Sequence, residues 1–422
     1  MKKYLFLIFL FSFSFSFAQK DLKTANFHYQ NFEFATAIPF YKNALYIDST
    51  LEAVEKLADC YRQTNQYKEA LYWYEKALQI PYYSATSVLY YADMLRVAGR
   101  YNEAIAQYEF YELYVQENQK DKIKKLIQAC EYAKSIQHTN TKLVIENVKD
   151  INTKYAESGI TLFNSQLIIS SDRKIGSNNL TDPFTKNQYY KLYSIPYAKN
   201  KDKIVYQKAK LFDNYNINKS YHNAFPSFDL INNQIYFTRT QLNPKLETNR
   251  IEIYKSKSTN GKRWQEPKLL SLNNSLQYSI LHPAVSPDSK FLVFASDQPG
   301  GFGGYDLYIS EIKEDGSFSA PRNLGAQINT VENELFPAFD SFGDLYFSSK
   351  GHLGLGGLDI FVSEYKNDVF NAVKHLEVGI NSSFDDYSIL FTEPHKSGYF
   401  CSDREGGKGS DDIYRFEYHP KK

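Results

Sequence analysis

The second half of the chain repeats one short acidic strand at a nearly constant interval. Asp306, Asp359 and Asp412 are each followed by Leu or Ile and then by Tyr or Phe, and they are equally spaced along the chain. Glu252 stands in the same slot one interval before Asp306, and Lys191 stands there in a still earlier, more degenerate copy. Short strands that recur with a long regular period, between turn residues, restrict the fold to a repeated sheet architecture.

Each repeat predicts four strands. Pro226, Pro283 and Pro337 mark the stretches FPSFD, HPAVSPD and FPAFD, and the alternating strands NQIYFTR, KFLVFAS and GDLYFSS follow them. Five units of about 54 residues with four strands each are typical of a β-propeller. We therefore expect a five-bladed β-propeller over residues 139–422.

The last repeat, DDIYRFEYHPKK, ends one strand short of a full blade. We expect strand 142–148, within TKLVIENVKDIN ahead of the first repeat, to supply the missing strand. That pairing would close the ring and remove two free sheet edges.

A different period occupies the first half of the chain. Ala58, Ala70 and Tyr74 recur one period earlier as Ala25, Ala37 and Tyr41, and one period later as Ala92, Ala104 and Tyr108. Small residues at fixed places let two helices approach closely, while the aromatic rings fill the space beside them. A period of about 34 residues with this pattern resembles the tetratricopeptide repeat. It predicts a helical array over residues 19–138, whose segment 117–137 is a capping helix.

Residues 1–18 are expected to be a secretory signal peptide. Two lysines precede an apolar run of about fourteen residues, and Ala18 offers a small residue before a cut at Gln19. No cysteine stands near the cut, so a lipid anchor is not indicated. No later stretch is apolar enough for a transmembrane segment. We therefore expect an exported protein, periplasmic or peripheral to the outer membrane.

Charge and cysteine content exclude some classes of protein. The 49 basic and 48 acidic residues give a net charge of +1, which provides no electrostatic basis for nucleic-acid binding. Three cysteines do not make a disulfide framework. A bridge between Cys60 and Cys130 stays open, although buried thiols are the favoured interpretation.

The glycine-rich loop SDQPGGFGGYDLYIS leads into an alternating strand, not a helix, and so does not predict a phosphate site. Calcium binding is the stronger alternative, because GGKGSD matches part of a calcium-binding nonapeptide. Its weak candidates are Asp297, Asp306, Asp403 and Asp411. The favoured interpretation is that the glycines form hairpin loops and that the aspartates fix these turns, with no cofactor.

No catalytic motif stands out. The eight histidines are scattered, without metal-binding spacing, and His282 occupies the slot of Phe225 and Phe336 in sister repeats. We therefore expect no enzyme and assign no catalytic residue. A cryptic hydrolase with two carboxylates beside a cleft stays as an alternative, and a glycan- or peptidoglycan-binding propeller is another.

The run SPDSKFLVFASDQPGGFGGYDLYIS, followed by APRNLGAQINT, is similar to the WD-like propeller repeats of the TolB type. A signal peptide, a tetratricopeptide array and this propeller together resemble OmpA-family envelope proteins of the Por (type IX) secretion and gliding machinery. The chain ends at Lys422 without the OmpA-type domain of those proteins. The resemblance implies a protein-binding scaffold whose partner is an outer-membrane β-barrel protein or another secretion component. Candidate partner-binding residues are Tyr61, Tyr67 and Tyr91 in the array and Gly301 and Gly354 in the propeller loops.

Overall fold

A computed structural model describes residues 19–139, 143–174, 181–200, 203–213, 216–219, 222–243, 248–259, 263–272, 277–366 and 369–418. The expected signal peptide, residues 1–18, lies outside them. The chain divides into two compact units. Among the described residues, the helical unit holds 19–135 and 181–188, and the strand-rich unit holds the remainder. The predicted order of a helical array followed by a five-bladed propeller is confirmed.

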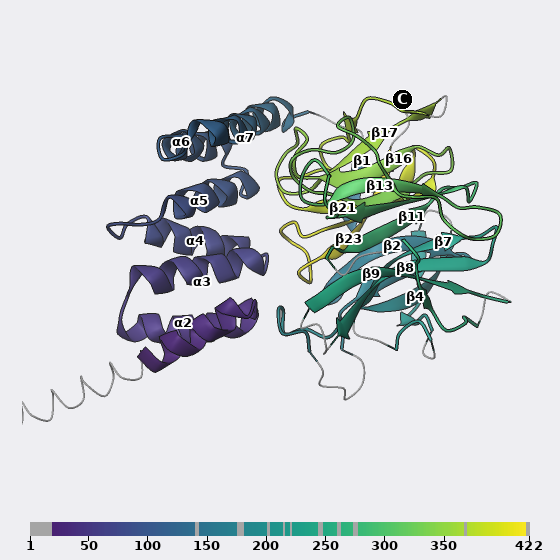
Figure 1. Cartoon of the computed structure of the whole chain (residues 1–422), viewed down its shortest axis with the longest axis horizontal. Helices are drawn as coiled ribbons and strands as arrows, with labels where there is room; N and C mark the ends of the chain where they lie inside the picture. Colours follow the sequence, from purple (N-terminus) through teal and green to yellow (C-terminus); the bar gives the residue numbers. More distant parts are fainter. Residues whose placement is uncertain are drawn as a thin grey trace, which may run out of the picture. The chain divides into compact units, whose positions relative to one another are not determined.

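The helical unit consists of successive helices that stack in chain order (Figure 1). A first helix occupies residues 19–30. The following helices are α2 (Phe34–Ile47), α3 (Leu51–Gln63), α4 (Tyr67–Ala77), α5 (Ala85–Val97), α6 (Tyr101–Glu112) and α7 (Glu117–Ile136). Thr50 and Ser84 cap α3 and α5, because each hydroxyl accepts a backbone N–H three residues later.

Each helical pair turns at a residue in the left-handed conformation. Phe32, Asn65 and Gly99 hold this position with φ of 59°, 55° and 69°. Between the helices of a pair, the repeated alanines and tyrosines are buried: Ala25, Ala37, Tyr41, Ala58, Ala70, Tyr74, Ala92, Ala104 and Tyr108. The expected packing of small residues beside aromatic rings is confirmed.

A segment that lies between two propeller strands in sequence belongs to the helical unit. Phe184 packs edge-on against Phe34 of α2, with ring centroids 5.3 Å apart. The Phe184 carbonyl accepts a hydrogen bond from the Ala35 N–H at 3.2 Å. Residues 181–188 are therefore held by both a backbone bond and an aromatic contact.

The strand-rich unit contains five blades, each an antiparallel sheet (Figure 1). The first blade is β2 (Glu157–Phe163), β3 (Gln166–Ser171), β4 (Lys191–Asn200) and the short β6 (Lys210–Leu211), and β5 (Lys203–Tyr206) pairs antiparallel with the last residues of β4. The second is β7 (Asn223–Asp229), β8 (Gln234–Asn243), β9 (Thr248–Lys257) and β10 (Lys268–Leu269), and the third is β11 (Ile280–Val285), β12 (Phe291–Ser296), β13 (Asp306–Glu311) and β14 (Arg322–Asn323).

The fourth blade is β15 (Glu334–Phe339), β16 (Leu345–Ser349), β17 (Asp359–Ser363) and β20 (Lys374–His375). Beside it, β18 (Tyr365–Lys366) and β19 (Val369–Phe370) form a separate hairpin. The fifth blade is β21 (Asp386–Glu393), β22 (Ser397–Ser402), β23 (Asp412–Tyr418) and β1 (Leu143–Asn147). β1 pairs antiparallel with β23, so the start of the propeller supplies the outer strand of its last blade.

The innermost strand of every blade carries a bulge at the same place. The pairing register of each first strand shifts by one step. One residue of each bulge has a left-handed φ between 51° and 60°: Gly159, Phe225, His282, Phe336 and Ser388. These five residues therefore hold the same position in their blades. A bulge bends the strand there and changes the direction of its side chain.

The three cysteines are free and buried. Burial raises the pKa of the Cys130 thiol to about 11 and that of Cys401 to about 12, so both stay protonated and unreactive near neutral pH. Among the helices within the described ranges, none combines the length and the apolar character that a membrane crossing needs.

Candidate functional site

The repeated aspartates fix the glycine loops from inside. The Asp306 carboxylate accepts hydrogen bonds from the Phe302 N–H at 2.6 Å and the Gly303 N–H at 3.2 Å, and from the Asn323 side chain at 2.7 Å. Asp359 and Asp412 accept two backbone N–H groups from their own loops in the same way. These carboxylates stabilise the hairpin between the second and third strands of their blades.

Packing explains the glycines of these loops. A Cβ on Gly301 would lie 2.5 Å from an oxygen of Asp306, and a Cβ on Gly354 would overlap the Asp359 carboxylate. The loop must approach the aspartate too closely for any side chain at either position. Partner binding by Gly301 and Gly354 stays a prediction, but their identity already has a structural reason.

The other three weak calcium candidates also bond to the protein. Asp297 accepts the Ser279 N–H at 2.7 Å, and Asp403 accepts the Asp385 N–H at 2.9 Å. Asp411 accepts the hydroxyl of Tyr387 at 2.7 Å. Burial raises the pKa of both Asp403 and Asp411, which favours their protonated form over the carboxylate that calcium requires.

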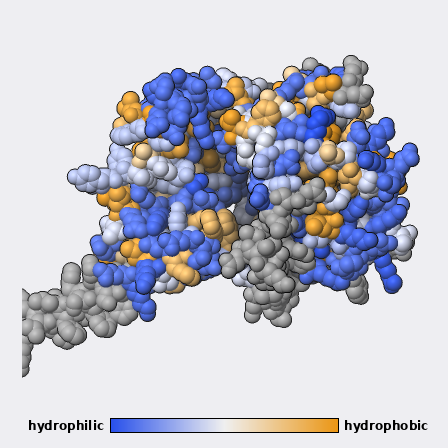
Figure 2. Space-filling view, viewed as in Figure 1, coloured by the Kyte–Doolittle hydropathy of each residue, from blue (hydrophilic) through white to orange (hydrophobic). Residues whose placement is uncertain are grey.

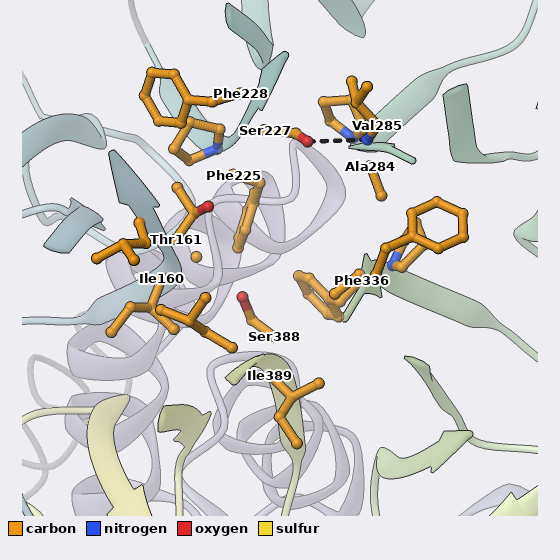
Figure 3. Close-up of a pocket in the computed structure, with 18 of the residues that line it drawn as sticks. Ile160, Thr161, Phe225, Ser227, Phe228, Ala284, Val285, Phe336, Ser388 and Ile389 are labelled. Carbon is orange, nitrogen blue, oxygen red and sulfur yellow. Dashed lines mark hydrogen bonds between the residues drawn. The ribbon is translucent and has the colours of Figure 1, made fainter. Parts of the chain in front are cut away.

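A cavity of about 260 Å³ lies where the innermost strands of the five blades meet. Figure 3 shows Phe225, Phe336 and Ser388 around this space on three different strands, with Ile160 and Thr161 on a fourth strand, β2. The Ser227 hydroxyl accepts the Val285 N–H at 3.0 Å and so joins the second and third blades at its edge. Most of the residues that line the cavity are apolar, but the surface that they expose to it is more polar than apolar.

Stacked rings form one side of this cavity. The rings of His282 and Phe336 lie 3.9 Å apart and nearly parallel, and Phe225 and Tyr387 extend the cluster. Burial lowers the pKa of His282 to about 3, so its ring is neutral at physiological pH. Its Nδ1 accepts the Phe336 N–H at 3.3 Å. These contacts agree with the place of His282 in the slot that Phe225 and Phe336 occupy in sister repeats.

The cavity offers little for hydrolysis. Asp340 is the one carboxylate among the described residues that line it. A glycosidase needs two carboxylates, one on each side of the cleft. This lining therefore gives the hydrolase alternative no acid–base pair.

The helical unit has its own repeated polar contact. Tyr41, Tyr74 and Tyr108 each direct a hydroxyl to a polar side chain 15 positions earlier, namely Asn26, Asp59 and Asp93. Asp59 also accepts the Tyr29 hydroxyl at 2.7 Å and pairs with Arg62. The Arg62 guanidinium lies 3.8 Å from the centre of the Tyr90 ring and so joins α3 to α5.

The predicted partner-binding tyrosines are not equally accessible. Tyr61 is only 6% exposed and lies in the core of the array, whereas Tyr67 and Tyr91 pack partly against that core. Tyr67 and Tyr91 are therefore the better candidates for contact with a partner.

The visible face of each unit is mostly hydrophilic with separate hydrophobic areas (Figure 2).

A comparison with protein families agrees with a helical repeat in the first part of the chain. A family model described as "Anaphase-promoting complex, cyclosome, subunit 3" matches residues 30–111. The yeast Tom70 crystal structure is 18% identical over 28% of this chain and 24% of Tom70, with a TM-score of 0.26. This chain thus spans about a quarter of Tom70. No curated protein matches the chain.

Two solved glycoside hydrolases are among the structures that match this chain. A thermostable family-43 glycoside hydrolase is 10% identical over 66% of this chain and 98% of its own, with a TM-score of 0.41. The GH43_1 enzyme from Xanthomonas citri is 10% identical over 68% and 92%, with a TM-score of 0.38. Identities this low give no indication of activity. The chain combines a tetratricopeptide-like helical region with a five-bladed β-propeller.

Proposed function

We propose that this chain is an exported, non-enzymatic scaffold that binds other proteins of the cell envelope. The observation that carries the proposal is the tetratricopeptide-like array. Arrays of this kind stack helices into an extended surface that suits a peptide or a partner protein. The propeller supports the proposal, because its repeated acidic residues are engaged in holding its own loops.

The proposed setting is the periplasm or the inner face of the outer membrane, within type IX secretion or gliding machinery. The order of a signal peptide, array and TolB-like propeller motivates this assignment, and an outer-membrane β-barrel protein is the partner that it implies. Envelope crosslinking followed by affinity purification of the full chain tests it. Recovery of cell-wall fragments alone, without an envelope protein, would reject the scaffold.

A pair of variants connects that experiment to the array. Tyr91 is half-buried on α5, whereas Tyr82 is 97% exposed in the connection before α5. Tyr91→Ala is expected to reduce recovery of the partner at least fivefold, and Tyr82→Ala is the matched control. Thermal unfolding of both variants separates a lost contact from a lost fold.

A second candidate, a glycan- or peptidoglycan-binding propeller, is favoured by the aromatic rings in the central cavity. Phe225 and Phe336 line this cavity, and aromatic side chains can pack against a sugar ring. Ser388 holds the bulge position that Phe225 and Phe336 hold in sister blades, so Ser388→Phe would fill the cavity at a position that accepts phenylalanine. Calorimetry with soluble peptidoglycan fragments should show binding by the wild-type chain that Ser388→Phe abolishes. Absence of binding by the wild-type chain would reject this candidate and leave the scaffold unaffected.

A further inference from the structure

Three side chains that can bind a metal ion meet between the fourth and fifth blades. Asp340 and Asp344 lie in the turn between β15 and β16, and His395 lies in the turn between β21 and β22. One ligand atom of each lies within 4.8 Å of the other two. Within the described ranges, no other set of three His, Cys, Asp or Glu side chains comes this close together.

One carboxylate oxygen of this cluster is buried and has no hydrogen bond. The Asp340 side chain is fully buried, and one of its oxygens, Oδ1, accepts the backbone N–H groups of Phe342 and Asp344 at 2.9 and 3.0 Å. The other oxygen, Oδ2, has no hydrogen-bond partner among the described residues. It lies 3.5 Å from His395 Nε2, and the Tyr346 hydroxyl interacts electrostatically with the same carboxyl group. Leaving such an oxygen unpaired is costly unless a ligand reaches it.

The sister turn of the second blade shows that the fold itself does not require this arrangement. Asp229 holds the position of Asp340, in FPSFD against FPAFD. Its Oδ1 accepts the Ser289 hydroxyl at 2.6 Å, and its Oδ2 accepts the Asn232 amide at 2.8 Å. Ser289 and His395 each reach across from the turn of the following blade, and both have a left-handed φ, 59° and 50°. A hydroxyl and an amide thus satisfy Asp229, whereas Asp340 faces an imidazole and a second carboxylate.

The other two ligands are held in place and can be reached from solvent. The His395 ring stacks on Phe342, with centroids 5.4 Å apart and planes 20° apart, and also lies against Phe391. The side chain of His395 is 55% exposed. Asp344 accepts the Tyr365 N–H at 3.0 Å through Oδ1. An ion can therefore enter from the His395 side and meet the buried Asp340 oxygen.

We propose that Asp340, Asp344 and His395 bind one Zn²⁺ ion. An imidazole among the donors favours zinc and neighbouring transition metals over calcium or magnesium, which prefer oxygen ligands alone. Three protein ligands leave one tetrahedral position for a water molecule or for a donor atom of a bound partner. The metal site is independent of the proposed scaffold function, because it uses turns of the propeller whereas the scaffold proposal rests on the helical array.

Zinc titration of the full chain tests this site. After removal of metal with a chelator, calorimetry should show one Zn²⁺ per chain with a dissociation constant in the micromolar range or below. His395→Gln and Asp344→Asn should each weaken binding at least tenfold. Asp229→Asn, in the sister turn, is the matched control and should leave the zinc affinity unchanged. Circular dichroism of the metal-free variants checks that all of them fold.

Cobalt provides a second readout. Co²⁺ bound to an imidazole and carboxylates at low coordination number gives visible absorption, and His395→Gln should remove that band while Asp229→Asn keeps it. The proposal is overturned if the metal-free wild-type chain takes up no Zn²⁺. It is also overturned if His395→Gln binds Zn²⁺ as tightly as the wild-type chain, because scattered surface histidines would then account for the uptake.

Discussion

The side-chain amide of Asn147 donates a hydrogen bond to the Asp412 carboxylate at 2.7 Å, although the two residues stand 265 positions apart. Asn147 lies on β1, the strand at the start of the propeller, and Asp412 lies on β23, the last strand. Sister contacts exist within single blades, where Asn323 donates to Asp306 in the third blade. The third blade makes this contact within one continuous segment of the chain. The fifth blade makes the same contact between two segments that are far apart in the sequence.

Asn152 completes this closure and is the residue to change. Its side chain accepts the Ile413 N–H at 2.9 Å and donates to the Ile413 carbonyl at 2.8 Å. Asn152→Ala would leave the buried Ile413 N–H unpaired, whereas the Ile413 carbonyl would still accept the Val148 N–H, so we expect the free energy of unfolding to fall by about 1–3 kcal/mol. Glu146→Ala, on an exposed position of β1, is the control and should change it by less than about 0.5 kcal/mol. Urea unfolding measures both, and equal values would contradict the closure role.

Gly354→Ala separates the structural role of the glycine loops from a binding role. A Cβ at this position would overlap the Asp359 carboxylate and displace it from the two N–H groups that it accepts. We expect a loss of about 1–3 kcal/mol in the free energy of unfolding. Leu353→Ala, in the same loop and 46% exposed, should have little effect. If Gly354→Ala were as stable as the wild-type chain, close packing would not explain the glycine.

The repeat periods predicted the architecture because every blade and every helical pair solves the same packing problem. Ala58, Ala70 and Tyr74 are buried for the same reason as their sister residues, so their spacing alone indicates a helical array. In the same way, Asp306 and its sister aspartates recur because each holds one hairpin loop. A shared physical role leaves a periodic signal, which a single sequence can show.

The remaining features lack such a signal. Asp340 and His395 come together because two turns of neighbouring blades meet, and the corresponding pair of the second and third blades is Asp229 and Ser289, without a histidine. Phe184 packs on Phe34 from a connection between two propeller strands, which the helical period does not reach. The sequence aligns Phe225, His282 and Phe336 in one slot but does not indicate a bulge there, and Gly159 and Ser388, which hold the same position, share no side-chain chemistry with them. A contact that occurs only once leaves no repeated pattern in the sequence, so it can be found only in the three-dimensional structure.

Two tyrosines that share one acceptor should differ in their contribution to the array. The Tyr29 hydroxyl donates to Asp59 at 2.7 Å, whereas the Tyr74 hydroxyl lies 3.5 Å from the same carboxylate. Tyr29→Phe should lower the free energy of unfolding by about 1–2 kcal/mol, since it removes a hydrogen bond to a charged group. Tyr74→Phe removes a weak contact and should cost less than about 0.5 kcal/mol. The reverse order, measured by urea unfolding, would show that distance does not rank these contacts.

His282 should make the propeller sensitive to mild acid. Its pKa is about 3 in the folded chain and about 6.5 in an unfolded chain. Between these values the unfolded chain binds a proton that the folded chain does not. The contribution of His282 to the free energy of unfolding is therefore fully present above pH 6.5. It is lost as the pH falls toward 3, by about 1.4 kcal/mol per pH unit.

His282→Phe tests this dependence, because Phe225 and Phe336 occupy the same bulge position in sister blades. The variant loses the acceptor for the Phe336 N–H, so it should be less stable than the wild-type chain at pH 7 by about 1 kcal/mol. Its stability should fall less steeply on acidification, since the other titrating groups are common to both chains. Between pH 6.5 and pH 4.5 the difference between the two chains should shift by about 2 kcal/mol in favour of His282→Phe. Parallel stability curves over this range would show that His282 does not stay neutral when the propeller is folded.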